Sequence, residues 1–201
     1  MDSITQAALG ASIAGAVAGK TLGRSALLTG ALLGTLPDLD VVIDYGTAVA
    51  NFTQHRGFSH SLFILAPLSL LIAWGLWRWK PLISYQRWLA LVGLILITHP
   101  LLDAFTTYGT QLFWPIGPPV AINSIFIIDP LYTLPLLAGC LAFLYRPPAS
   151  RTVAAGLLVS SLYLGWTLVA QQIITDRVRP ALANAGMEQA ALMVQPMPFN
   201  T

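Results

Sequence analysis

Charge is the property in which this sequence is poorest. Only 9% of its 201 residues are Asp, Glu, Lys or Arg, while 56% are hydrophobic. A soluble domain carries about 25% charged residues, and a chain this apolar cannot cover itself with a water-compatible surface. The ten Lys and Arg residues are scattered singly or in twos and threes, so nothing indicates a nucleic-acid partner. We therefore expect a membrane protein.

Cysteine and histidine are also scarce. The one cysteine, Cys140, lies inside the apolar stretch LPLLAGCLAFLY, where a thiol behaves as a small hydrophobic group. A single cysteine excludes a disulfide framework within the chain and does not indicate a compartment. The three histidines, by contrast, lie at the ends of apolar segments, close to several Asp residues. Helix packing does not require that arrangement.

Six apolar segments predict an all-α bundle of membrane helices. They cover residues 4–19, 25–36, 61–77, 88–102, 126–145 and 152–173, and the first is rich in Ala and Gly, which favours a tightly packed inner helix. A membrane helix needs about 20 residues, so the second segment is short. Either its helix continues through the PDLD motif into Val41–Ile43, or the first two segments form a re-entrant hairpin. We expect a membrane-embedded domain over 1–173, followed by a polar tail, 174–201, that resembles the start of a truncated soluble part.

The basic residues predict how the segments are oriented. Seven of the ten lie in alternate connections between segments, which the positive-inside rule assigns to the cytoplasm. With this topology, all eight acidic residues and all three histidines fall at the opposite side of the membrane. Four tryptophans near the basic side are expected to anchor the membrane interface: Trp74, Trp77, Trp79 and Trp88.

Metal-competent side chains recur in three short motifs. His99 and Asp103 are four residues apart in HPLLD, so one helix face carries both. His55 and His60 belong to HRGFSHS and are expected to converge from a loop and the start of the next helix, for which Ser59 is a candidate N-cap. Asp38 and Asp40 of PDLD add oxygen ligands. The predicted metal ligands are Asp38, Asp40, His55, His60, His99 and Asp103.

These residue types favour hydrolytic chemistry. Mixed imidazole and carboxylate ligands suit zinc, with manganese as an alternative, and a bound divalent ion acidifies water to a pKa of about 7. Arg56 has the donors to bind an anionic substrate, and His55 and Asp40 are each interpreted as a ligand or a general base. A phosphoester or a lipid-linked anionic ester is the expected substrate, with membrane lipid as a partner. Tyr108, Ser124 and Asp129 are expected to support the site or to cap helices.

The order of the motifs resembles a known family. MDSITQAALG, GTLPDLD, HRGFSHSL, THPLLDAFTTYGT and NSIFIIDPLYTLP follow one another as in the YdjM-like family of inner-membrane-associated proteins classed as metal-dependent hydrolases. The resemblance covers most of residues 1–135 and implies a bacterial inner-membrane protein whose six candidate ligands occupy motif positions, with its site facing the periplasm. Where many members read Thr-His, this chain reads Thr5-Gln6, so it lacks one ligand that a second metal would use.

A second function class remains open from the residues alone. The same cluster in a non-enzymatic membrane protein would bind a structural metal or handle ions. Transport favours ionisable groups near the bilayer midplane, whereas these groups gather at one end of the segments, which favours interfacial hydrolysis.

Overall fold

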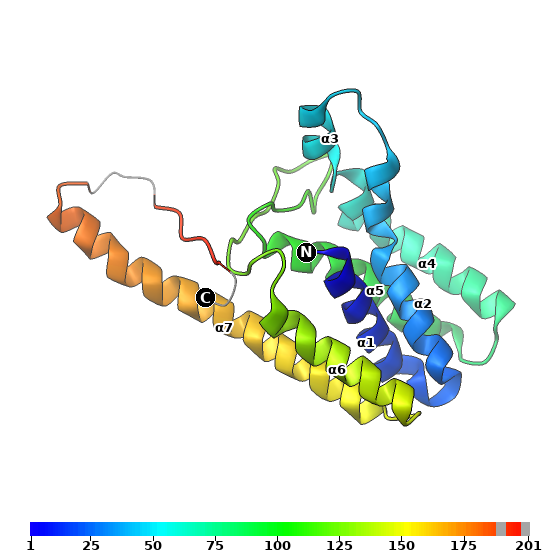
Figure 1. Cartoon of the computed structure of the whole chain (residues 1–201). Helices are drawn as coiled ribbons and strands as arrows, with labels where there is room; N and C mark the ends of the chain where they lie inside the picture. The colour runs from blue at the N-terminus through cyan, green and yellow to red at the C-terminus, as the bar shows by residue number, and fades with distance from the viewer. Residues whose placement is uncertain (188–191, 198–201) are drawn as a thin grey trace.

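A computed structural model describes residues 1–187 and 192–197, and these form helices and loops without a strand. The elements are α1 (Ser3–Leu22), α2 (Arg24–Thr35), the 3₁₀ helix η1 (Pro37–Val42), α3 (Ala48–Gln54), the 3₁₀ helix η2 (Phe58–His60), α4 (Leu62–Trp79), α5 (Tyr85–Ala104), α6 (Pro130–Tyr145) and α7 (Ser150–Asn184). The six predicted apolar segments correspond to α1, α2, α4, α5, α6 and α7, which confirms the all-α membrane bundle (Figure 1).

Three of these helices are long and apolar enough to cross a membrane, namely α4, α5 and α7, and α6 is a shorter apolar helix. The α2 helix has only 12 residues, but η1 follows it after Leu36. The helical path therefore continues through the PDLD motif to Val42, as the first of the two alternatives has it. At about 1.5 Å per residue in α2 and about 2.0 Å in η1, this path rises about 30 Å.

The small residues of α1 make it the centre of the bundle. It packs against α2, α5, α6 and α7, and its backbone lies very close to that of α2. A Cβ atom added to Gly30 would lie 2.2 Å from the carbonyl oxygen of Gly10, and one added to Gly34 would lie 2.5 Å from that of Gln6. Only glycine permits such an approach, so the predicted close packing of this helix is confirmed.

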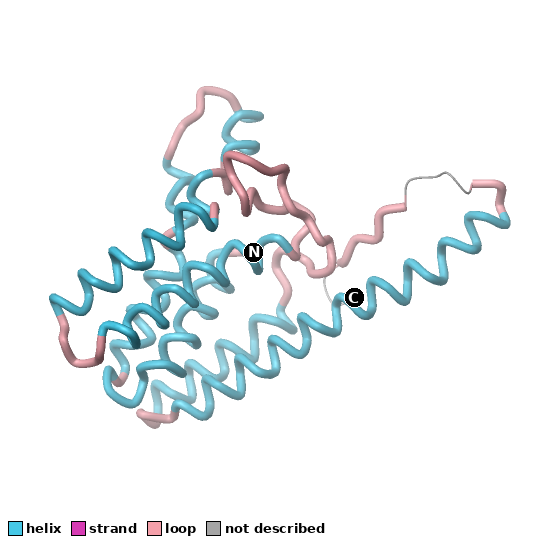
Figure 2. Tube along the Cα trace, turned by 180° about the vertical axis from the view of Figure 1, so that it is seen from behind, coloured by secondary structure: helices cyan, strands magenta, loops and turns pink. Residues whose placement is uncertain are grey.

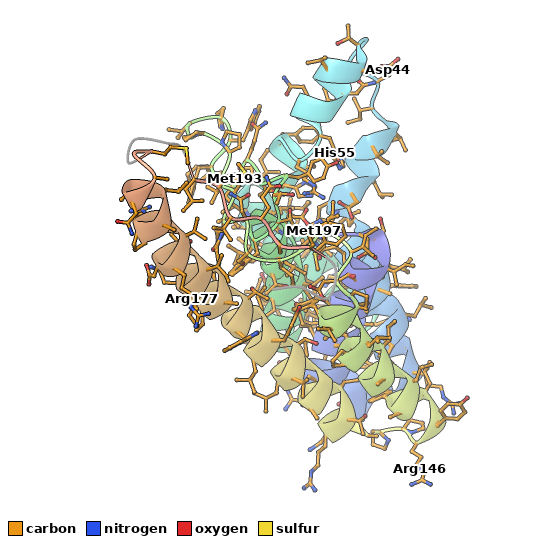
Figure 3. The ribbon with its side chains drawn as sticks, turned by 60° about the vertical axis from the view of Figure 1, so that its left-hand side comes forward. Asp44, His55, Arg146, Arg177, Met193 and Met197 are labelled. Carbon is orange, nitrogen blue, oxygen red and sulfur yellow. The ribbon has the colours of Figure 1, made fainter. Side chains whose placement is uncertain are left out.

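The two ends of the bundle differ in character. The α1–α2, α4–α5 and α6–α7 connections lie together at one end, where Arg146 is labelled in Figure 3. The N-terminus, α3 and the long loop between α5 and α6 lie at the other end, near His55 (Figures 2 and 3). The predicted basic connections are thus at one end and the histidine motifs at the other. We call these the basic end and the site end.

One tryptophan prediction is wrong. Trp74 and Trp79 are 58% and 72% exposed, as interface anchors would be, but Trp88 is only 1% exposed. Its indole Nε1 donates to the carbonyl oxygen of Lys80, so Trp88 packs inside the basic end and fixes the α4–α5 connection.

The segment after residue 173 begins as a helix, because α7 continues to Asn184 and extends past the rest of the bundle (Figure 1). Farther along the chain, Val194, Gln195 and Pro196 line a small cavity together with residues of α7. The predicted tail, 174–201, also includes 188–191 and 198–201, which lie outside the described residues.

The α1–α2 contact generates a stability prediction. Gly30→Ala places a Cβ against backbone that cannot yield cheaply, and we expect it to cost about 1–3 kcal/mol and lower the melting temperature in detergent. Gly75→Ala in α4 is the matched control, because its added Cβ meets nothing within 4 Å. Equal melting temperatures for the two variants would contradict the close packing.

Candidate metal centre

Four of the six predicted ligands converge at the site end. Asp38 comes from η1, His60 from η2, and His99 and Asp103 from the last turns of α5. Each residue offers one nitrogen or oxygen atom, and these four atoms lie within 4.8 Å of one another. We call these residues the four-residue cluster; it could hold a metal ion.

The spacing within the cluster fits a single ion. The Nε2 atom of His60 lies 3.1 Å from Nε2 of His99, 3.5 Å from Oδ1 of Asp38 and 3.3 Å from Oδ2 of Asp103. The His99 Nε2 atom lies 3.3 Å and 3.8 Å from the same two oxygens. Ligands bound tetrahedrally at 2.0–2.2 Å are separated by about 3.3–3.6 Å. These five separations are close to that range, and the oxygens of Asp38 and Asp103 lie within 4.8 Å of each other.

A backbone carbonyl fixes the orientation of the His99 ring. Its Nδ1 lies 2.7 Å from the carbonyl oxygen of Gly34 in α2. Because a carbonyl only accepts hydrogen bonds, Nδ1 must carry the hydrogen. The Nε2 atom of neutral His99 therefore presents its lone pair to the cluster, which is the arrangement that a metal-binding imidazole requires.

A serine and a carboxylate orient His60 in the same way. The hydroxyl of Ser59 lies 2.5 Å from Oδ2 of Asp40 and 2.9 Å from Nδ1 of His60. The carboxylate can only accept, so Ser59 donates its hydrogen to Asp40 and accepts one from His60. The lone pair of neutral His60 then also faces the cluster.

The crowding of lone pairs and negative charge affects the proton affinity of His60. Burial by itself would lower the pKa of His60, but contacts with the carboxylates of Asp103 and Asp38 outweigh burial and raise that pKa above its usual value. The environment thus favours positive charge at this point, which a divalent cation would supply in place of the proton.

The structure does not bring the other two predicted ligands, Asp40 and His55, into the four-residue cluster. Both oxygens of Asp40 are occupied: Oδ1 lies 2.9 Å from Nδ1 of His55, and Oδ2 accepts from Ser59 and from the backbone N–H of Arg56 at 3.0 Å. Asp40 therefore lies on the Nδ1 side of His60, away from the cluster, and accepts from the Ser59 hydroxyl that orients the His60 ring. His55 lies farther out, with a third of its side chain exposed.

Arg56 connects the cluster to a cavity. Its backbone has a φ of 63°, a left-handed conformation that is strained for a side chain of this size. Its Nε lies 3.3 Å from Oδ2 of Asp103 but is not aligned for a hydrogen bond, and its guanidinium lies 5.8 Å from the centre of the Tyr108 ring. Arg56 and His55 line a cavity of about 450 Å³, together with Tyr108, Gly109, Thr110, Gln111, Pro119 and Ile127.

The sequence did not indicate that Gln6 and the amino group of Met1 belong to the centre. Gln6 of α1 is 1% exposed, and its amide donates to Oδ1 of Asp103 and to the carbonyl oxygen of His99, both at 3.1 Å. It thereby leaves Oδ2 of Asp103 for the cluster, and the Met1 amino group also contacts Oδ1. The prediction that Ser59 caps α4 is wrong, because Ser61 occupies that position.

Asp129, Ser124 and Tyr108, which were expected to support the site or to cap helices, lie in three different parts of the structure. Asp129 caps α6 by accepting from the N–H of Leu131, and it accepts from the hydroxyl of Tyr163, both at 2.9 Å. Ser124 accepts from Thr167 of α7. Tyr108 is at the cavity, beside Arg56.

Comparison with known proteins identifies the family. The family model described as YdjM inner membrane protein matches residues 1–174. Inner membrane protein YbcI of Escherichia coli K12 is 36% identical over 112 residues, which cover 55% of this chain and 64% of that protein. The uncharacterized protein YfhP of Bacillus subtilis 168 is 29% identical over 104 residues, which cover 51% of this chain and 32% of that protein.

The chain thus spans less than two thirds of the length of either relative. No solved structure matches it significantly. The family match covers α1 to α6 and most of α7, and includes every residue of the four-residue cluster. As its motifs predicted, the chain belongs to the YdjM inner membrane protein family.

Proposed function

We propose that this protein is a membrane-embedded, metal-dependent hydrolase of phosphoesters or related anionic esters. The observation that carries the proposal is the four-residue cluster, in which two imidazole nitrogens and two carboxylate oxygens surround a space of metal-ion size. Arg56 and His55 lie beside it and line the adjoining cavity. A metal-competent group, a cation for the substrate and a titratable imidazole are thus adjacent.

Zinc is the metal we expect, with manganese as the alternative. Two imidazoles and two carboxylates form a donor set that both ions accept. A bound divalent ion would supply an acidified water and stabilise charge that develops on the ester oxygens. Asp38 is the most exposed member of the cluster, at 15% of its side chain, and its Oδ2 has no hydrogen-bond partner. This carboxylate is the ligand best able to shift when water or substrate binds.

Arg56 is suited to hold the anionic group of the substrate. Its guanidinium is close enough to Asp103 to stay oriented, with Nη1 donating to the carbonyl oxygen of Gly109 at 3.4 Å. A guanidinium can bind two oxygens of a phosphate at once. It would hold the ester between the cavity and the cluster.

His55 and Asp40 form a pair suited to proton transfer. Asp40 holds Nδ1 of His55 at 2.9 Å, which leaves Nε2 as the nitrogen that can exchange a proton. The partly exposed ring lines the cavity. We assign His55 as the general acid or base and Asp40 as its positioning residue.

We propose that all six apolar segments cross the bacterial inner membrane, with η1 completing the path of α2. The basic end would face the cytoplasm and the site end the periplasm. The opposite positions of His55 and Arg146 support this arrangement (Figure 3).

A second candidate function is a structural metal site in a non-enzymatic protein. One observation favours it: the cluster offers four protein ligands, which would close the coordination of a tetrahedral zinc ion and leave no position for water. Chelator-sensitive hydrolysis in a panel of phosphoesters and lipid phosphates would exclude this reading. A metal-loaded protein that is inert on the whole panel would support it and contradict the hydrolase.

Metal content gives the first test. Wild-type protein purified without chelator is expected to bind about one divalent ion, measured by elemental analysis, and the His60→Ala, His99→Ala double variant is expected to lose it. His55→Ala is the matched control and should retain the ion, because His55 is outside the cluster. Unchanged stoichiometry in the double variant would remove the metal-site hypothesis.

The support of His60 gives the second test. Ser59→Ala removes the hydroxyl between Asp40 and His60, and we expect the metal affinity to fall about 10–100-fold. Ser59→Thr keeps a hydroxyl and should restore most of the affinity. Competition with a chelating dye measures both, and an affinity for Ser59→Ala equal to that of the wild type would exclude the orienting role.

Proton transfer gives the third test. His55→Gln is expected to lower kcat about 10²–10⁴-fold on any phosphoester that the wild type hydrolyses, with unchanged metal content. Arg56→Lys should instead raise KM most strongly, because a lysine cannot bind two phosphate oxygens in one plane. Full activity in the histidine variant would show that His55 takes no part in catalysis.

A further inference from the structure

The loop between α5 and α6 is unusual for a segment outside the helices. Residues 105–128 contain no Asp, Glu, Lys, Arg or His. Large apolar side chains are nevertheless exposed along it: Ile116 at 82%, Ile128 at 59%, Tyr108 at 55% and Phe113 at 44%. A surface with these properties is typical of contact with lipid and not of contact with water.

The loop is attached to the histidine motif, and the two together form one apolar rim. The backbone N–H of Leu62 donates to the carbonyl oxygen of Leu112, and the Ser61 hydroxyl donates to that of Trp114. Aromatic contacts join Phe58 to Trp114 and Phe63 to Phe113. We call the exposed residues of this rim the apolar collar: Phe58, Phe63, Phe113 and Ile116, which are 38%, 55%, 44% and 82% exposed.

The same loop forms most of the cavity wall. Six of the eight residues that line the cavity belong to it, and the other two are His55 and Arg56. The cavity therefore has an uncharged wall with one cationic group, Arg56, which is 8% exposed. This combination suits a ligand with one anionic group and an apolar body.

Helix lengths place the centre below the membrane surface. From Arg87 at the basic end, α5 rises about 18 Å to His99 and about 24 Å to Asp103. The hydrocarbon core is about 30 Å thick, and any tilt of the helix shortens the rise along the membrane normal. The two cluster residues of α5, His99 and Asp103, therefore lie below the far surface of the hydrocarbon core when Arg87 is at the near surface.

We propose that the cavity takes the phosphomonoester headgroup of a bilayer lipid, which enters from the membrane past the apolar collar. Arg56 binds the phosphate, the collar contacts the acyl chains, and the phosphoester lies beside the four-residue cluster. The substrate is thus a lipid phosphate and not a free phosphoester. This inference rests on the proposed hydrolase function, which it makes more specific.

Photolabelling tests lipid binding without relying on activity. The protein is reconstituted in phosphatidylcholine vesicles with a trace of phosphatidic acid that carries a diazirine on an acyl chain, and labelled peptides are mapped. Labelling of residues 105–128 is expected to fall at least tenfold in Arg56→Gln and on addition of unlabelled phosphatidic acid, but not of glycerol phosphate. Labelling of α7 is the internal reference and should not change.

A charge placed in the collar is the second variant. Ile116→Asp should lower labelling of the loop at least tenfold, with unchanged metal content. Tyr145→Asp is the matched control, because Tyr145 is 83% exposed at the basic end. Loop labelling that neither Arg56→Gln nor Ile116→Asp reduces, or that glycerol phosphate competes as well as the lipid, would overturn the inference.

Hydrolysis is measured in the same vesicles, so that the two proposals can fail separately. Turnover of phosphatidic acid at least 100-fold faster than that of glycerol phosphate supports both. Equal turnover of the two esters contradicts the lipid substrate and leaves the hydrolase standing. Specific labelling without turnover of either ester contradicts the hydrolase and identifies the cavity as a lipid-binding site.

Discussion

The site depends on one constraint: Nε2 of His60 and Nε2 of His99 are held 3.1 Å apart, and both face two carboxylate oxygens. Four electron-rich atoms at this spacing repel one another unless a proton on one imidazole or a metal cation lies between them. The surroundings preserve the arrangement. Gly34 and Ser59 occupy the outer nitrogens of His99 and His60, and Gln6 holds one oxygen of Asp103 so that the other faces inward.

The packing of α1 against α2 makes this geometry possible. The close contact of Gly34 with the backbone of Gln6 brings two helices together at the site end. One of them supplies the carbonyl that orients His99, and the other supplies the amide that orients Asp103. The small residues that let the helices approach therefore also position the ligands. Close packing and the metal-competent site are two results of one sequence feature.

Much of the fold followed from hydropathy and charge. The six helices, the small-residue interior and the separation of the basic end from the histidine motifs are regular features that a pattern records. The i, i+4 spacing likewise put His99 and Asp103 on one helix face. Spacing did not separate the cluster from its supports, because Asp38 and Asp40 are the same residue type two positions apart. Only the turn of η1 directs Asp38 to the cluster and Asp40 to Ser59 and His55. The burial of Trp88 depends on tertiary packing, and so does the contact of Ser59 with His60.

Three features of the site end can be explained together by its position in a membrane. The uncharged loop, the apolar collar and the lone cation at the cavity are each unremarkable alone, but together they suit a substrate that arrives from lipid. X-ray absorption spectroscopy of the zinc-loaded protein in vesicles tests the central claim most directly. We expect one zinc with two imidazole nitrogens and two or three oxygens at about 2.0–2.2 Å. A spectrum without imidazole scattering would contradict the centre described here.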